Sequence, residues 1–212
     1  MDEAKPAAPV RRNRAATEAR LRAAVEDLLV ESGFAALTPS AVAKRAGVDK
    51  MLIYRYFGDM AGLVRTIAFA DDFFPSFDQI CGGKTVADLR AMPVNERAAW
   101  VIGRNLRALS DRPVVLELMV WEMIERNELT AIMEEARESL GLRLMAELFG
   151  DVADRALLQV VSALLGAGVT YLALRRRKIR WYAGVDLRDA ATDDAIEHAI
   201  AIMTAPMAGQ DS

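Results

Sequence analysis

The stretch TPSAVAKRAGVDKMLIYRYF, residues 38–57, contains two short apolar segments on either side of a glycine. Thr38 and the proline after it are typical of a helix start, because the hydroxyl caps a first-turn amide and proline has no amide to satisfy there. Gly47 is typical of a sharp turn, because glycine readily adopts a positive φ. The pattern predicts one helix over 39–46 and a second, capped by an aspartate, over about 50–57.

Two helices joined by about three residues indicate a helix-turn-helix. Ala43, Gly47 and Ile53 fall at offsets of four and ten, and each residue type has a reason. A small side chain at Ala43 lets the helices approach closely, and Ile53 and Phe57 are expected to fill the angle between them. In such a motif the second helix enters the major groove of DNA.

If Ile53 and Phe57 face inward, the opposite face of the second helix carries Lys50, Met51, Tyr54 and Arg55. Ammonium and phenol groups can bind phosphates, a guanidinium can bind guanine, and a thioether can touch a thymine methyl. The alternative is that the aromatic side chains pack against the next helix, an interpretation that stays open above all for Tyr56.

Charge is concentrated at the N-terminal end. The whole chain of 212 residues has a net charge of −3, whereas residues 10–58 hold nine Lys/Arg against five Asp/Glu. A small basic module on an acidic body is typical of a protein that meets a polyanion at one end. Arg11, Arg12 and Arg14 form a basic arm that could follow the DNA backbone or enter the minor groove, or could simply be solvated.

A longer stretch, LRAAVEDLLVESGFAALTPSAVAKRAGVDKMLIYRYFGDMAGLV (21–64), resembles the DNA-binding domain of TetR-type (tetracycline-repressor-like) transcriptional regulators, and the resemblance extends over 15–68. It implies phosphate contacts from Thr38, Lys50, Tyr54 and Tyr56, with Ser40 and Lys44 as additions. Arg55 and the start of the helix, at Met51, would contact bases. The family commonly has a lysine where this chain has Met60, so only the helix dipole and backbone amides are expected to bind a phosphate there.

The remaining sequence predicts further helices and hence an all-α fold. An amphipathic helix over 17–32 ends at a glycine. The other helices are expected at 60–74, 94–110, 113–126, 129–148, 152–178 and 190–204. The expected organisation is a DNA-binding domain at 11–58 and a helical regulatory, ligand-binding and dimerisation domain at 59–206, between disordered tails at 1–10 and 207–212.

Residues 156–174 contain no charged side chain and are followed by a basic cluster. This pattern is compatible with a membrane span, but alanine and glycine are frequent in it, which favours a buried helix that packs closely with another helix. The resemblance implies the same, because TetR-type proteins dimerise through their last two long helices. The expected interface residues are Ala163, Gly166, Ala167, Ile196, Ile200 and Met203.

Aromatic and methionine side chains with a few polar groups are typical of a small-molecule pocket. The middle of the chain has this composition, although ordinary core packing explains each residue equally well. The resemblance implies an effector pocket in this half without fixing its residues. The candidates are Phe73, Phe74, Phe77, Trp100, Arg104, Met119, Trp121, Glu122, Met123, Asn127 and Tyr171.

No catalytic or metal-binding motif is evident. His198 is the only histidine, and no Cys/His zinc spacing, Glu-x-x-His pair or phosphate-binding glycine loop occurs. Cys81, the only cysteine, cannot form an internal disulfide, which suits a reducing cytoplasm; it is expected to be an incidental thiol or a redox sensor. The sequence therefore predicts a homodimeric, effector-released repressor without enzymatic activity or cofactor. The alternative is an interaction module that has lost DNA binding.

Overall fold

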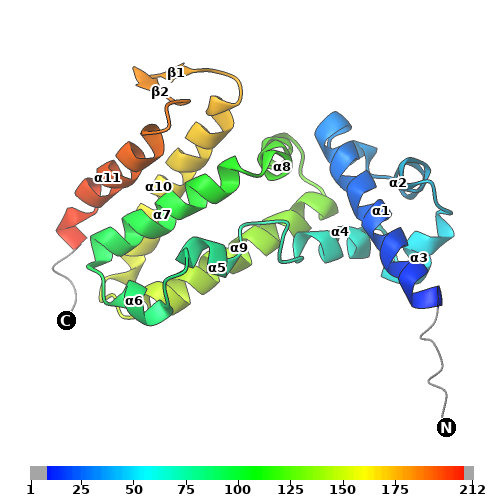
Figure 1. Cartoon of the computed structure of the whole chain (residues 1–212), viewed down its shortest axis with the longest axis horizontal. Helices are drawn as coiled ribbons and strands as arrows, with labels where there is room; N and C mark the ends of the chain where they lie inside the picture. The colour runs from blue at the N-terminus through cyan, green and yellow to red at the C-terminus, as the bar shows by residue number, and fades with distance from the viewer. Residues whose placement is uncertain (1–8, 208–212) are drawn as a thin grey trace, which may run out of the picture. The chain divides into compact units, whose positions relative to one another are not determined.

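The computed structural model describes residues 9–207, with side chains from Arg14 onward, and the regular secondary structure of this part of the chain is almost entirely helical (Figure 1). The expected all-α class is confirmed. Most of the tails expected at 1–10 and 207–212 lies outside the described residues. The chain divides into two compact units, Met1–Phe69 with Trp121–Met133, and Ala70–Val120 with Glu134–Ser212.

The first unit, here the head, contains four complete helices and a 3-10 turn, together with the end of α8 (Pro113–Ile124) and the start of α9 (Glu128–Phe149). Its elements are α1 (Pro9–Ser32), η1 (Phe34–Ala36), α2 (Pro39–Ala46), α3 (Met51–Phe57) and α4 (Met60–Ala68). Helix α1 packs against α2 and α4, and α3 packs against α4. Their shared core consists of buried aliphatic side chains, among them Leu21, Val25, Leu29, Val42, Ile53 and Val64.

Two boundaries in the head differ from the expected ones. Helix α1 begins at Pro9 rather than at residue 17, because proline is well tolerated in a first turn and no helix breaker follows it. Helix α4 ends at Ala68 rather than near residue 74. The basic residues 11, 12 and 14 therefore belong to a helix and not to an extended arm.

A close contact in the head involves Gly33, which ends α1 with a φ of 72°. A Cβ atom at this position would lie 2.7 Å from the indole ring of Trp121, at the end of α8. Glycine is therefore required here both by backbone conformation and by space.

The second unit, here the body, is built around α7 (Val94–Ser110), which packs against α5 (Phe77–Cys81), α6 (Val86–Arg90), α10 (Arg155–Arg176) and α11 (Thr192–Met203). It also contains parts of α8 (Pro113–Ile124) and α9 (Glu128–Phe149), the strands β1 (Trp181–Tyr182) and β2 (Val185–Asp186), and the turn η2 (Ala205–Met207). The expected helices from residue 94 onward are present, with ends shifted by at most three residues.

Three short elements of the body were not predicted. Helices α5 and α6 each begin with a capping box, Ser76 with Gln79 and Thr85 with Asp88. The strands β1 and β2 form an antiparallel hairpin in which Trp181 pairs with Asp186. Its two turn residues both have positive φ, a property that the alanine at position 183 does not signal in the sequence.

A buried arginine connects α7 with the end of α9. Arg97 is almost completely buried, and its guanidinium donates hydrogen bonds to the carbonyl of Leu148 and, over 2.9 Å, to the carboxylate of Asp151. Burial tends to raise the pKa of the Asp151 carboxyl, but the hydrogen bonds from Arg97 outweigh this effect, so the pKa lies below its ordinary value.

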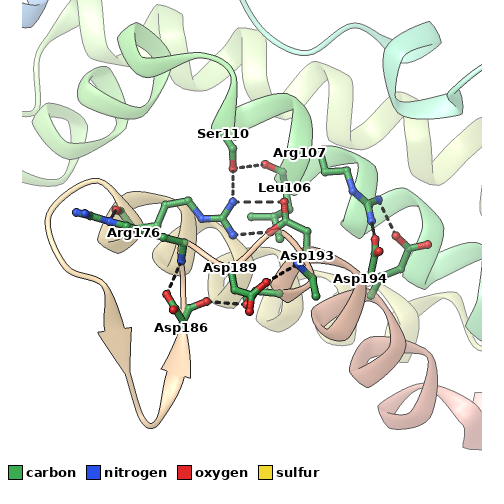
Figure 2. A network of polar contacts seen from close by, with 12 residues as sticks. Leu106, Arg107, Ser110, Arg176, Asp186, Asp189, Asp193 and Asp194 are labelled. Atoms are coloured by element: carbon green, nitrogen blue, oxygen red, sulfur yellow. Dashed lines mark hydrogen bonds and ion pairs between the residues drawn. The ribbon is translucent and has the colours of Figure 1, made fainter.

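A polar network joins α11 to α7 and α10 (Figure 2). Arg107 of α7 forms ion pairs with Asp194 over 2.6 Å and with Glu197 over 2.7 Å. Arg176, near the end of α10, pairs with Asp193 and donates to the Ser110 hydroxyl over 3.3 Å. The start of α11 is thereby held against two other helices of the body.

Candidate nucleic-acid interface

Helix α2 has the caps that the sequence predicts. The hydroxyl of Thr38 accepts a hydrogen bond from the amide of Ala41 over 3.2 Å. At the other end Gly47 adopts the left-handed conformation, with φ 64° and ψ 41°. The amide of Val48 donates to the carbonyl of Ala43 over 3.0 Å, so the turn closes as a Schellman motif.

Helix α3 presents two different faces. Ile53 is fully buried, whereas Met51 is 60 % exposed and Tyr54 is 44 % exposed. The Asp49 carboxylate accepts a hydrogen bond from the amide of Met51 over 2.8 Å and so orients the first turn. Phe57, expected to be buried with Ile53, is only partly buried. The outward face is thus open to a partner, as the motif requires.

Tyr56 lies between two guanidinium groups. Arg55 donates to its hydroxyl over 3.0 Å and lies 4.9 Å from the ring centre, and Arg14 of α1 lies 4.8 Å from the same ring. Arg14 is also paired with Glu18 over 2.7 Å. Tyr56 therefore joins α1 to α3 through cation–π contacts, an arrangement that sequence spacing did not reveal.

The other predicted cations have different surroundings. Lys44 and Lys50 are exposed on α2 and in the turn before α3, and Ser40 is exposed in the first turn of α2. The side chains of Arg11 and Arg12 lie outside the described residues. Arg45 was not among the predicted residues. It forms an ion pair with Glu31 of α1 over 2.5 Å, so its charge is already paired within the head.

The start of α4 differs from expectation in one respect. The Asp59 carboxylate accepts a hydrogen bond from the amide of Gly62 over 2.7 Å, so one of the backbone amides expected for a phosphate is already occupied. Gly62 is closely packed, since a Cβ atom there would lie 2.0 Å from the carbonyl oxygen of Phe57. This turn fixes α4 against the end of α3.

Residues 21–67 match the family described as bacterial regulatory proteins, tetR family. The match covers α2 and α3 completely, half of α1 and most of α4. This N-terminal part of the chain is a TetR-family region. The head is accordingly a helix-turn-helix DNA-binding domain of the TetR type, and the protein is a DNA-binding transcriptional regulator.

Solved structures of several bacterial regulators share the fold of the whole chain. A TetR-family transcription regulator from Marinobacter aquaeolei VT8 superposes with a TM-score of 0.59 at 13 % identity, covering 91 % of this chain and 97 % of that one. The fatty acid degradation regulator FadR from Bacillus halodurans gives 0.57 at 16 % identity, covering 94 % and 97 %. NalD from Pseudomonas aeruginosa, the secondary repressor of the MexAB-OprM multidrug efflux pump, gives 0.56 at 16 % identity, covering 92 % and 95 %. None of the curated proteins compared with this chain matches it.

The candidate ligand residues are distributed over both units of the chain. Phe73, Phe74, Phe77 and Met119 are buried, and Trp121 packs over Gly33 while Glu122 is half-buried. Met123 is 73 % exposed. The side chain of Asn127 caps α9 by accepting from the amides of Leu129 and Thr130, and Tyr171 contacts the ring of Tyr182 in the hairpin.

Only Trp100 and Arg104 among these candidates line a described cavity. It is an open groove of about 540 Å³ between α7 and α11, lined also by His198 and Glu197. A second cavity of about 660 Å³ lies between α7, α9 and α10 and is lined by none of the ligand candidates. It is lined by Ala163, Gly166 and Ala167, which were expected at a dimer interface.

The other interface candidates are divided between the core and the surface. Ile200 is buried, Ile196 is half-buried, and Met203 is exposed. Helix α10 is the one helix in the described part of the chain that is long and apolar enough to cross a membrane. Its most apolar stretch of 18 residues has a mean hydropathy of 1.9, and 17 % of this stretch is buried. Among the described residues, no group of three or more His, Cys, Asp or Glu side chains could hold a metal ion.

Proposed function

We propose that this protein is a cytoplasmic, homodimeric transcriptional repressor that binds an inverted-repeat operator and is released from it by a small-molecule effector. The observation that carries the proposal is the pair of adjacent residues Ile53 and Tyr54, one fully buried and the other exposed, on a helix fixed by caps and a tight turn. A helix held in this way can enter the major groove with its outward face leading.

The proposed contacts follow from the exposed groups of α2 and α3. The hydroxyls of Thr38 and Ser40 and the ammonium groups of Lys44 and Lys50 would bind phosphates. Met51, at the exposed start of α3, would touch the methyl group of thymine. Tyr54 would bind a phosphate beside it.

Arg55 and Tyr56 require a rearrangement in this proposal. The guanidinium of Arg55 donates to the hydroxyl of Tyr56 over 3.0 Å, so it would have to leave that hydroxyl to bind a guanine. Tyr56 could then direct its hydroxyl to a phosphate while Arg14 stays over its ring. Arg11 and Arg12, in the first turns of α1, would add long-range attraction to the DNA backbone.

Dimerisation is proposed through α10 and α11. Both helices carry large exposed apolar side chains, which are costly in water and typical of an interaction surface. Those on α10 recur at helical spacing on one face, and those on α11 lie in its last turns: Leu157, Val160, Leu164, Tyr171, Ile202 and Met203. A second copy would cover both helices at once, whereas a bilayer could take up α10 but not the much shorter α11.

Repression and effector release rest on likeness to other regulators. NalD is named a repressor of an efflux pump and FadR a regulator of fatty acid degradation. A ligand that binds one arrangement of the two heads better than the other would change the affinity for DNA. The same logic requires a cavity in the body that can hold such a ligand.

Selection of bound duplexes from a random library, using the purified full-length protein, tests this proposal. We expect one inverted repeat whose half-sites lie about one helical turn apart, bound with an affinity that falls steeply as salt rises. Recovery of no sequence by a folded dimer would contradict the proposal and favour an interaction module. Recovery of a single unrepeated half-site would contradict the dimeric mode of binding.

A further inference from the structure

We infer that the cavity between α7, α9 and α10 is the binding site of an uncharged, predominantly apolar small molecule. The inference rests on the proposed function, because it assigns the chemical class of the effector. The cavity has a volume of about 660 Å³, within the range of sites that enclose drug-sized ligands. All its lining residues come from the body.

The first argument is the packing of α10. Its fully buried residues are Leu158 near one end and Val169 and Ala173 near the other. No residue between Leu158 and Val169 is buried, over about 16 Å of helix. The helix is therefore anchored at both ends, and in its middle the cavity leaves a gap between one side of α10 and the helices α7 and α9.

Small residues face this gap. Ala163, Gly166 and Ala167 of α10 line the cavity, and a Cβ atom added to Gly166 would meet no other atom within 4 Å. The same is true of Gly141, which lines the cavity from α9. Gly141, Ala163 and Ala167 are exposed, so the cavity is open to solvent on this side, and a bound molecule that covers these residues would extend the core of the body.

The polarity of the lining defines the class of ligand. The wall formed by α7 and the end of α9 includes the buried side chains of Val101, Ile102 and Phe149. The polar side chains are mostly neutral, namely Asn105, Gln159 and Ser162, and can orient a ligand through hydrogen bonds.

The two charged lining residues, Arg137 and Glu138, are neighbours on α9 with opposite sign. The lining therefore offers no net charge to an ionised ligand. A charged group would also lose its hydration against the apolar wall without gaining a matching excess of opposite charge.

The test uses the full-length protein and N-phenyl-1-naphthylamine, an uncharged fluorescent probe, with three competitors that share one apolar chain: 1-decanol, decanoate and decylammonium. We expect the probe to bind and 1-decanol to displace it at concentrations at least tenfold lower than either ion. Equal or stronger displacement by decanoate or by decylammonium would overturn the assignment of an uncharged ligand. Absence of probe binding and of any shift in melting temperature with 1-decanol would overturn the site itself.

Two variants test whether the probe binds in the cavity. Gly166→Phe and Gly141→Phe fill it from opposite walls, and each should weaken probe binding at least tenfold while raising the melting temperature of the unliganded protein. Gly166→Ala is the matched control, because its methyl group occupies open space and should leave binding within twofold. If both phenylalanine variants fold and bind the probe as the wild type does, the probe lies elsewhere and the inference fails.

Measuring the DNA affinity of the same samples distinguishes a failure of this inference from a failure of the proposed function. A protein that selects an inverted repeat but binds neither probe nor 1-decanol would retain its DNA-binding role and lose this site. A protein that binds the probe in the cavity but selects no DNA would support the ligand site and contradict the proposed operator binding.

Discussion

Neighbouring residues on α3 have opposite environments, and their substitution should separate folding from DNA binding. Ile53→Ala removes a fully buried side chain and is expected to lower the free energy of unfolding by about 2–4 kcal/mol. Tyr54→Ala removes a half-exposed side chain and should leave stability nearly unchanged while weakening operator binding roughly tenfold, the effect of one hydrogen bond. Urea unfolding and DNA titration of both variants measure the two effects. A Tyr54→Ala protein as unstable as Ile53→Ala would reverse the assignment of the two faces.

Two glycines with similar φ angles should respond differently to alanine. At Gly33 a Cβ atom would overlap the ring of Trp121, whereas at Gly47 it would meet nothing within 4 Å. Gly47→Ala should cost only the left-handed backbone conformation, about 1–2 kcal/mol. Gly33→Ala should cost at least about 1 kcal/mol more, because of the overlap and because its ψ of −170° lies in a region that is essentially restricted to glycine.

A double-mutant cycle identifies the cause of that difference. In a Trp121→Leu background the ring is absent, so the cost of Gly33→Ala should fall by the part that the overlap contributes, while the cost of its backbone conformation, φ 72° and ψ −170°, should remain. Thermal or urea unfolding of the four proteins gives the comparison. An unchanged cost in the Trp121→Leu background would assign the effect of Gly33 to its backbone alone.

Local sequence signals predicted individual residues well where the chemistry is local. The cap at Thr38 and the turn at Gly47 were predictable, because each depends on contacts within a few residues. The stacking of Arg14 on Tyr56 was not, since 42 positions separate the two residues and only the packing of α1 brings them together.

At the scale of elements, the long helices were predictable and the short ones were not. Helices α7 to α11 carry enough apolar residues to set their extent, with ends that differ from expectation by a few residues. Helices α5 and α6 have only five residues each, too few for a periodic pattern, although their capping boxes are visible in the sequence. The cavity beside α10 could not be predicted, because it depends on how three distant helices are spaced.

The connection between α7 and α9 predicts a dependence of stability on pH. The Asp151 pKa is lowered in the folded protein, so the ionised carboxylate stabilises the fold above its unfolded-state pKa of about 4, and this contribution disappears as pH falls through the folded value. Asp151→Asn should therefore reduce stability at pH 7, by no more than about 1 kcal/mol because the carboxylate is partly exposed. Urea unfolding at pH 7 and at pH 3.5 should show the difference from wild type shrinking with pH. An equal difference at both pH values would show that the charge of Asp151 contributes nothing.

At the scale of the whole molecule, two exposed apolar residues distinguish a dimer interface from ordinary surface. Leu164 on α10 is 69 % exposed and Met123 at the end of α8 is 73 % exposed. Leu164→Glu should convert a dimer into a monomer, because it places a charge in the centre of the proposed interface, while Met123→Glu should remain dimeric. Sedimentation velocity at micromolar concentration measures both. Dimers of unchanged affinity in the Leu164→Glu protein would place the interface away from α10.

The central claim is that two copies of α3 bind successive major grooves of one duplex. The most direct measurement is the affinity for the selected inverted repeat after insertion of five base pairs between its half-sites. This insertion turns one half-site to the opposite face of the DNA, so a dimer of fixed spacing should bind at least a hundredfold more weakly, down to the affinity of a single half-site. Unchanged affinity would contradict the account, because it would mean that the two reading helices are not held together by the body.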